Sequence, residues 1–227
     1  MSASFPSSVW DGELLAAAGL ASKLNDSVIE PHLLRSLALD IERLKDELVA
    51  VQVYLTGEYT EDLKFPATSV KVSGSKPPTW TSYKGGEVLA FSDQAVAGNE
   101  EIVYFNVQVP HGRAANTDVE FHVHWVGEDN TAGDARWALT YSWANIAATF
   151  PTEQTLTADC ANAATDEHLI HSLGKLTGTG KTRSSMIICS LRRNSSHAND
   201  TLTAKKAYLL EVDCHIKVSK LGDDFVI

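Results

Sequence analysis

Two histidines, His122 and His124, stand two positions apart in the segment HVHWVGE, which ends at Glu128. Alternate side chains of a β-strand lie on the same face of a sheet, so both imidazoles can approach one metal ion if this segment is a strand. Glu128 would add a carboxylate from the following turn. Further histidines that can complete a cluster in space are His168, His171 and His215.

This segment resembles the H-x-H-x(3)-E part of the cupin family, whose jelly roll binds a metal through those residues. The resemblance covers one strand and its turn. Asn116 stands where that family has a glycine, and no later strand supplies the second motif with its further histidine. The alternative is architectural: both imidazoles face a protomer interface or a polar interior and bond to Asp213, Glu211 or Thr140. A metal site needs a full ligand set, so we expect the architectural role, with no metal and no cofactor.

The segment LTGTGKT, ending at Thr182, has the composition of a phosphate-binding loop. That motif requires a glycine five residues before Gly180, where this chain has Lys175, and a helix whose N-terminus holds the phosphate. The run SSMIIC, which starts at Ser184, indicates a strand instead. We therefore expect a β-turn between strands. A GxSxG nucleophile motif is also lacking, and we expect the protein not to be an enzyme.

Composition excludes several classes of partner. The formal net charge of -10 and the pI of about 5.2 argue against a nucleic-acid surface, which needs clustered Lys and Arg. No stretch reaches the roughly 18 consecutive apolar residues that a membrane span requires. The first residues lack the basic region of a secretory signal, so we expect synthesis in a cytoplasm. Cys160, Cys189 and Cys214 lack CxxC spacing and are expected to be reduced core residues.

Residues 28–58 carry apolar side chains at heptad spacing. This spacing is typical of a coiled coil, because it keeps one stripe facing a partner helix. Pro31 suits the first turn and Gly57 the end, while Asp40 would face Lys45 of a parallel neighbour. The alternative is an amphipathic helix packed on its own domain. The stripe consists of Leu34, Leu37, Ile41, Leu44, Leu48, Val51 and Leu55.

Residues 1–27 form the least regular segment. Phe5, Val9 and Trp10 are set among Ser and Pro, and they give an otherwise disordered arm something to bury on a partner. We expect these three side chains to anchor the protein. A frayed chain end is the alternative.

Residues 59–227 are expected to form an antiparallel β-sandwich, of the jelly-roll type. Several segments alternate apolar and polar residues, and no intervening helix is long enough for a βαβ crossover. The expected strands are 68–73, 79–84, 87–91, 101–109, 118–126, 135–143, 154–159, 167–176, 184–193 and 205–219.

Three runs within this region, DVEFHVHW from Asp118, RWALTYSWANI from Arg136 and LLEVDCHI from Leu209, together resemble the C-terminal β domain of tailed-bacteriophage structural proteins. Those proteins are described as head-fibre, capsid-decoration or tail-fibre proteins. The resemblance implies a homotrimer with an N-terminal virion anchor, a helical stalk and a distal β head, and it carries over no catalytic residue. The matching positions, which we interpret as lining the interior of the head or the trimer axis, are His122, His124, Trp125, Trp137, Trp143, Asp213 and His215.

We therefore expect a mainly β, homotrimeric protein on a virion surface, trimerised by the heptad stripe and anchored to major capsid or neck proteins. Two other functions stay open. One is a tail-associated adhesin that binds a host glycan through loops of the head. The other is a cupin-like metalloenzyme that uses His122, His124 and Glu128.

Overall fold

The computed structural model describes residues 31–94 and 96–219, together with their side chains except those of 31–37, 55 and 56. The expected anchor residues Phe5, Val9 and Trp10 lie outside the described residues. The described chain divides into helix α3 and a β head, which form separate compact units with the boundary between Gly57 and Glu58.

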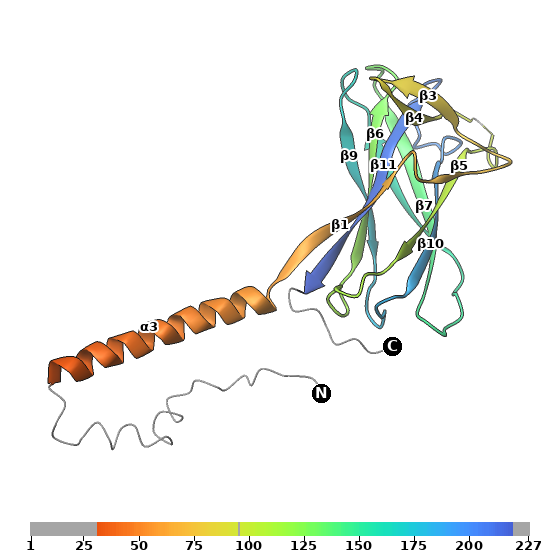
Figure 1. Ribbon diagram of the computed structural model, residues 1–227. Coiled ribbons are helices and arrows are strands. Elements are labelled where there is room, and N and C mark those ends of the chain that lie inside the picture. The colour runs from red at the N-terminus through yellow and green to blue at the C-terminus, as the bar shows by residue number, and fades with distance from the viewer. Residues whose placement is uncertain (1–30, 95, 220–227) are drawn as a thin grey trace. The chain divides into compact units, whose positions relative to one another are not determined.

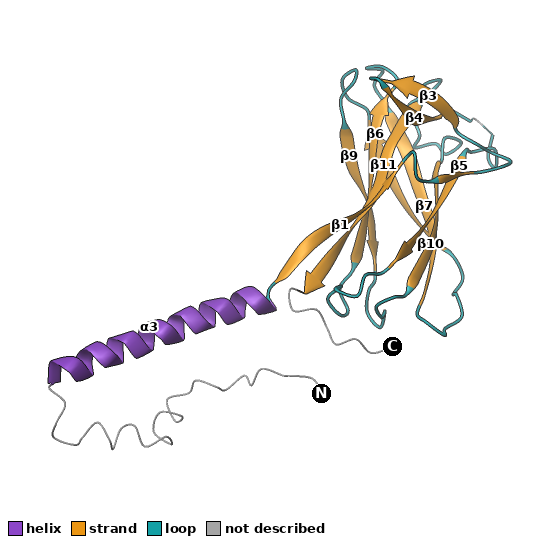
Figure 2. Cartoon of the chain, in the orientation of Figure 1, coloured by secondary structure: helices purple, strands orange, loops and turns teal. Residues whose placement is uncertain are grey.

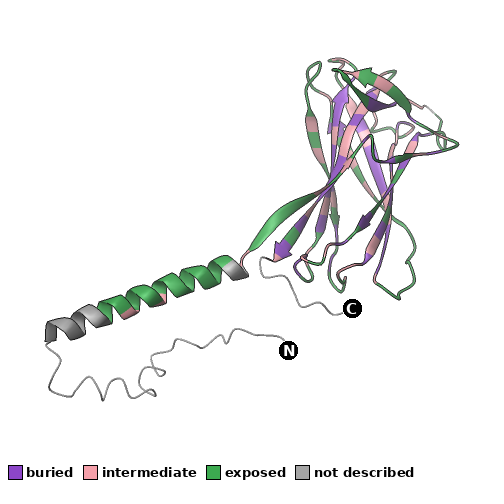
Figure 3. Cartoon of the chain, in the orientation of Figure 1, coloured by how far each residue is buried: buried purple, intermediate pink, exposed green. Residues whose placement is uncertain are grey.

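Helix α3 spans Pro31–Thr56, inside the segment where the heptads predict a helix (Figure 1). Its polar flank carries an ion pair of 3.2 Å between Arg43 and Glu47. Of the stripe residues whose side chains are described, Leu44, Leu48 and Val51 are exposed, within the exposed part of the helix in Figure 3. Val49 and Tyr54, outside the stripe, are exposed as well. No helix of the described residues is long and apolar enough to cross a membrane.

The head is an antiparallel β-sandwich of two sheets, as expected (Figure 2). Its eleven described strands have these bounds: β1 Glu58–Pro66, β2 Lys71–Val72, β3 Thr79–Tyr83, β4 Gly86–Phe91, β5 Ile102–Gln108, β6 Val119–Gly127, β7 Asp134–Ala144, β8 Gln154–Ala161, β9 Leu169–Leu176, β10 Met186–Arg193 and β11 Ala207–Ser219.

The strand order identifies the sandwich as a jelly roll. One sheet has the order β3-β4-β11-β6-β9, with β1 also paired to β11, and the other has the order β2-β5-β10-β7-β8. Without the outer strands β1, β2 and β3, the strands form two groups of four, β4 to β7 and β8 to β11. Within each group, consecutive strands lie in opposite sheets. This is the arrangement in which two Greek keys wrap around one core.

The core between the sheets is built by alternate residues of each strand. Trp125 of β6 and Trp137 of β7 meet edge to face with ring centroids 6.4 Å apart, and Phe91 of β4 lies 5.0 Å from Trp137. Such aromatic pairs join one sheet to the other and contribute about 1 kcal/mol each beyond their buried area. Figure 3 marks the buried residues along the strands of both sheets.

The three cysteines are buried and free, as expected. Burial raises the pKa of both Cys160 and Cys214 to about 12, so these thiols stay protonated.

Strand β1 was missing from the expected strands. Its sequence, EYTEDLKFP, is too charged to show apolar alternation, and it lies at the edge of the sheet with most side chains exposed. It pairs with the C-terminal part of β11, from Glu58 opposite Ser219 to Pro66 opposite Glu211. Pairing within the chain thus accounts for the length of β11.

A buried ion pair holds the loop that follows β10. Arg193 donates to Asp200 through Nε at 2.9 Å and through Nη2 at 2.6 Å. Both side chains are only 1% exposed. Arg193 Nη2 also donates to the Leu202 carbonyl at 2.6 Å, so this ion pair holds the loop against the core.

Candidate functional site

The two histidines of the HVH segment lie on the outer face of the six-stranded sheet, on β6. Their neighbours Phe121 and Val123 point into the core, so the alternation of the strand turns the imidazoles outward. In the adjacent strand β11, Asp213 stands opposite His122. His215, two residues further along, shares that outer face. The register of two neighbouring strands therefore gathers two histidines from β6 and an Asp-x-His pair from β11.

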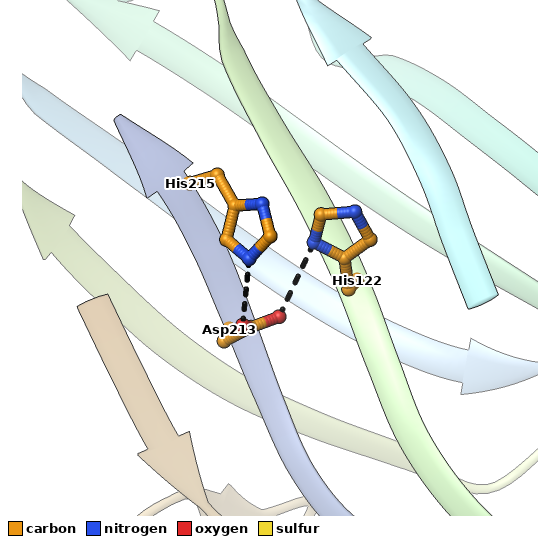
Figure 4. A group of neighbouring side chains, drawn as sticks. All are labelled: His122, Asp213 and His215. Atoms are coloured by element: carbon orange, nitrogen blue, oxygen red, sulfur yellow. Dashed lines mark ion pairs between the residues drawn. The ribbon is translucent and has the colours of Figure 1, made fainter. Parts of the chain in front are cut away.

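The Asp213 carboxylate is the centre of this cluster, which we call the histidine–aspartate cluster: His122, His124, Asp213 and His215. Asp213 Oδ1 lies 3.5 Å from His122 Nδ1, and Asp213 Oδ2 lies 3.4 Å from His215 Nε2. Figure 4 shows both imidazoles, from separate strands, turned toward the two oxygens of one carboxylate. The two rings lie with their centroids 4.1 Å apart.

His124 approaches the same carboxylate from the other side. Its Nε2 lies 3.6 Å from Asp213 Oδ1. Its Nδ1 lies 2.9 Å from Nε2 of His168, which precedes β9, so one ring nitrogen of the pair donates to the other. His168 therefore fixes the orientation of the His124 ring.

Burial makes the cluster unusual for the outer face of a sheet. Asp213 is 3% exposed and His122 is 9% exposed. Asp213 Oδ1, His122 Nδ1 and His124 Nε2 are all buried without a hydrogen-bond partner. Buried polar atoms are paired in the great majority of cases, so three converging unpaired atoms need an explanation.

Two further carboxylates flank the cluster. Glu120 accepts a hydrogen bond from Ser172 at 2.8 Å and lies 3.6 Å from His122 Nε2. The Ser172 hydroxyl is the main cause that lowers the pKa of Glu120, so this carboxylate stays ionised. On the β1 side, Asp62 Oδ1 lies 3.1 Å from His215 Nε2.

Burial lowers the pKa of His122, and the neighbouring His215 lowers it further, while Asp213 and Glu120 act in the opposite direction. The net effect favours the neutral imidazole, which has a lone pair on one ring nitrogen. His215 is more accessible than His122, because it lines a groove of about 360 Å³ together with Glu120 and Lys175. The cluster is thus buried at His122 and open at His215.

The structure separates Glu128 from the histidines with which the sequence grouped it. Glu128 follows the end of β6 and its carboxylate accepts from the backbone N–H of Lys206 at 3.1 Å. His171 is also outside the cluster, because it accepts from the indole N–H of the core residue Trp125 at 3.2 Å. Of the expected bonding partners Asp213 is close to both imidazoles, whereas Thr140 belongs to the five-stranded sheet.

From the sequence, Asp213 is interpreted only as architectural, whereas His215 is also named as a histidine that can complete a cluster in space. The signal that could have found them as possible ligands is the spacing of DCH at 213–215, which equals that of HVH at 122–124. Pairing of the two strands could not be read from either motif alone.

The glycine-rich segment near Thr182 connects β9 to β10. A strand follows it, and not the helix of a phosphate-binding loop, as expected for a turn between strands. Its lysine, Lys181, donates to the carbonyl of Trp143 at 2.7 Å. A Cβ on Gly178 would lie 1.7 Å from the Thr117 carbonyl oxygen, which explains the glycine by close packing. The buried Arg113, which sequence reasoning missed, donates to the carbonyls of Lys181, Thr117 and Gly178.

No family model and no curated protein matches the chain. Solved structures show a distant likeness. The CBM36-1 domain of a multidomain xylanase from the hindgut metagenome of Trinervitermes trinervoides is similar at 12% identity and a TM-score of 0.38, over 73% of this chain and 100% of that domain.

The Cry4Aa toxin from Bacillus thuringiensis is similar at 12% identity and a TM-score of 0.44, over 69% of this chain and 23% of the toxin. A structure of infectious bursal disease virus, Gx strain, is similar at 10% identity and a TM-score of 0.37, over 71% of this chain and 33% of the viral chain. At these values the likenesses identify no ligand and no partner.

Proposed function

We propose that the protein is a non-catalytic structural protein of a virion surface, a homotrimer in which α3 is a parallel coiled-coil stalk and the jelly roll is the head. In this proposal residues 1–27 dock on major capsid or neck proteins through Phe5, Val9 and Trp10. The proposal describes a head fibre or a capsid decoration protein.

The observation that carries the proposal is that no described residue covers the middle of the apolar stripe of α3. Leu44, Leu48 and Val51 are 58%, 48% and 53% exposed in the single chain. They occupy successive d, a and d positions, which a neighbouring helix in a coiled coil would cover. A single helix gains most of its stability from packing of its apolar face, so a partner is needed.

The flanks of the stripe support a coiled coil. Arg43 and Glu47 pair within the helix, as do Lys45 and Glu42 at 3.3 Å. These charges sit beside the stripe and leave it free for another helix. A parallel neighbour would also bring Asp40 opposite Lys45.

Labelling on purified particles tests the location. An antibody to the head should decorate the virion surface, and its distribution between capsid and tail tip separates decoration from host recognition. Analytical ultracentrifugation of the purified protein should give three times the chain mass. A monomer across the micromolar range would overturn the trimer, and particles without label would overturn the virion role.

A glycan-binding adhesin is the second candidate, favoured by one surface. Tyr104, Phe150 and Ile188 are exposed around a groove of about 340 Å³ on the five-stranded sheet, with Ser190 and Glu153 beside them. Aromatic faces next to hydroxyl and carboxylate groups suit a sugar ring, which has apolar and polar sides. A glycan array with a Tyr104→Ala control tests this role: binding by the parent protein that the variant loses would support it.

A further inference from the structure

We propose that His122, Asp213 and His215 bind a divalent transition metal ion of the zinc class. Side-chain atoms of these three residues lie within 4.8 Å of one another. The site differs from the ligand set suggested by the sequence, because Asp213 and His215 replace His124 and Glu128. It is independent of the proposed assembly, since all its ligands come from one head.

The spacing of the candidate ligand atoms fits a coordination sphere. Zinc lies about 2.0–2.1 Å from histidine nitrogen and about 2.0–2.2 Å from carboxylate oxygen, so the edges of its tetrahedron are about 3.3 Å long. The two nitrogen–oxygen distances at Asp213 are 3.5 Å to His122 and 3.4 Å to His215. Both exceed the range of about 2.7–2.9 Å for a charge-assisted hydrogen bond. The two nitrogen–oxygen distances, each to a different oxygen of Asp213, are therefore close to the edge of a coordination sphere. The three ligand atoms lie within 4.8 Å of one another, so binding of an ion would draw the side chains slightly together.

A second observation in favour of a metal ion is that two of the candidate ligand atoms are buried without a hydrogen bond. His122 Nδ1 and Asp213 Oδ1 face each other, are buried and have no hydrogen-bond partner. Their separation of 3.5 Å leaves room for a cation, to which each of the two atoms can offer a lone pair. A metal ion would bond to His122 Nδ1 and to Asp213 Oδ1 at once. His215 Nε2, which faces the other oxygen of Asp213, would be its third ligand.

The surroundings resemble the outer shell of a metal site. A metal-bound histidine usually turns its second nitrogen to a carboxylate. His122 has this arrangement, because its Nε2 faces Glu120, which Ser172 holds in place. Asp62, from β1, differs from this pattern, because it faces the same His215 Nε2 that approaches Asp213 and so lies beside the proposed ligand atom. The negative charges on both sides favour a cation between them.

The ligand types select the class of ion. Two imidazoles and one carboxylate suit Zn²⁺, Co²⁺ or Ni²⁺, whereas Ca²⁺ and Mg²⁺ prefer sites built from oxygen alone. Because His215 lines the groove, a fourth position can face water there. The ion would fasten β6 to β11 across the outer face of the sheet.

Metal titration of the full-length protein, first treated with EDTA and then dialysed, tests the site. We expect calorimetry to show about one Zn²⁺ bound per head, and Co²⁺ to give the visible absorption of a four-coordinate complex. Zn²⁺ should raise the melting temperature, and EDTA should reverse the rise. Mg²⁺ at the same concentration should do neither. No saturable Zn²⁺ binding, or binding without the Co²⁺ spectrum, would overturn the proposal.

Three variants and a control assign the ligands. His122→Ala and Asp213→Asn should each weaken Zn²⁺ binding by at least about 100-fold. Asp213→Asn should keep the metal-free head folded, because the amide can donate to a neighbouring imidazole. His124→Ala should have a smaller effect than His122→Ala. The control is His197→Ala, which changes an exposed histidine that accepts only from the backbone of its own loop.

The control should bind Zn²⁺ like the parent protein. Equal affinity in the parent and in folded Asp213→Asn and His122→Ala variants would show that zinc binds elsewhere and would overturn the site. Loss of binding in the folded Asp213→Asn variant, with the control unchanged, supports it even if His122→Ala fails to fold.

Discussion

Removal of the Asp200 carboxylate should strongly destabilise the head. Asp200 accepts two hydrogen bonds from Arg193, and its Oδ2 also accepts from the backbone N–H of Arg136 at 2.9 Å. In Asp200→Ala the guanidinium of Arg193, 1% exposed, keeps its charge without a counter-ion. The loss of one partner of a buried ion pair costs about 3–5 kcal/mol. For a domain of this size that is a fall of roughly 6–20 °C in melting temperature.

Thermal unfolding followed by circular dichroism, with urea titration for the free energy, measures the effect. Asp166→Asn is the matched control, because it breaks an ion pair with Lys84 in which the two side chains are 44% and 62% exposed. Solvent screens that pair, so we expect only a small change. The reasoning about the buried pair would be refuted if Asp200→Ala unfolded at the same temperature as Asp166→Asn.

Three further changes test other parts of the molecule. Replacement of Leu44 and Leu48 with Asp should dissociate the trimer, because each charge in the seam costs several kcal/mol; a variant that light scattering still finds trimeric, with an unchanged midpoint, would show that the head alone holds the assembly. Deletion of residues 1–27 should leave the melting temperature unchanged and abolish co-sedimentation with particles that lack the protein, whereas a lower melting temperature would place the arm in the core of the free trimer. The hydrogen bond from Lys205 lowers the pKa of Asp129 to about 2, below its ordinary 3.8, so its contribution to stability is present above about pH 4 and is lost as the pH falls toward 2. Asp129→Asn should therefore flatten the acid dependence of stability in that window, and an identical pH profile would contradict it.

Much of the head could be predicted from the sequence because its strands are long and bury one face. Phe121, Val123 and Trp125 alternate with outward residues, and this pattern located β6. Strand β1 does not bury such a face. Its hydrogen bonds to β11 hold it in the sheet, and backbone pairing at a sheet edge has no signature in the side chains.

The site was predictable only in part, for a related reason. Local spacing placed His122 and His124 on one face, but Asp213 reaches them through the register of two strands separated by about ninety residues. Glu128 is near the histidines in sequence, yet the extended strand carries it away from them. The burial of Arg193 with Asp200 could not be predicted either, because the sequence does not reveal that two opposite charges are buried together.

Strand β11 has a consequence for synthesis on the ribosome. It lies between β6 on one side and β1 and β4 on the other, and it is the last of the described strands in chain order. Until residue 219 has emerged, the larger sheet consists of the strand pairs β3–β4 and β6–β9 and the unpaired strand β1, each with an open edge. Open edges pair readily with other chains, so a nascent chain stopped before Ala207 should depend on chaperones. Completion of the jelly roll therefore waits for β11, and neighbouring nascent chains on one polysome need to be kept apart until then.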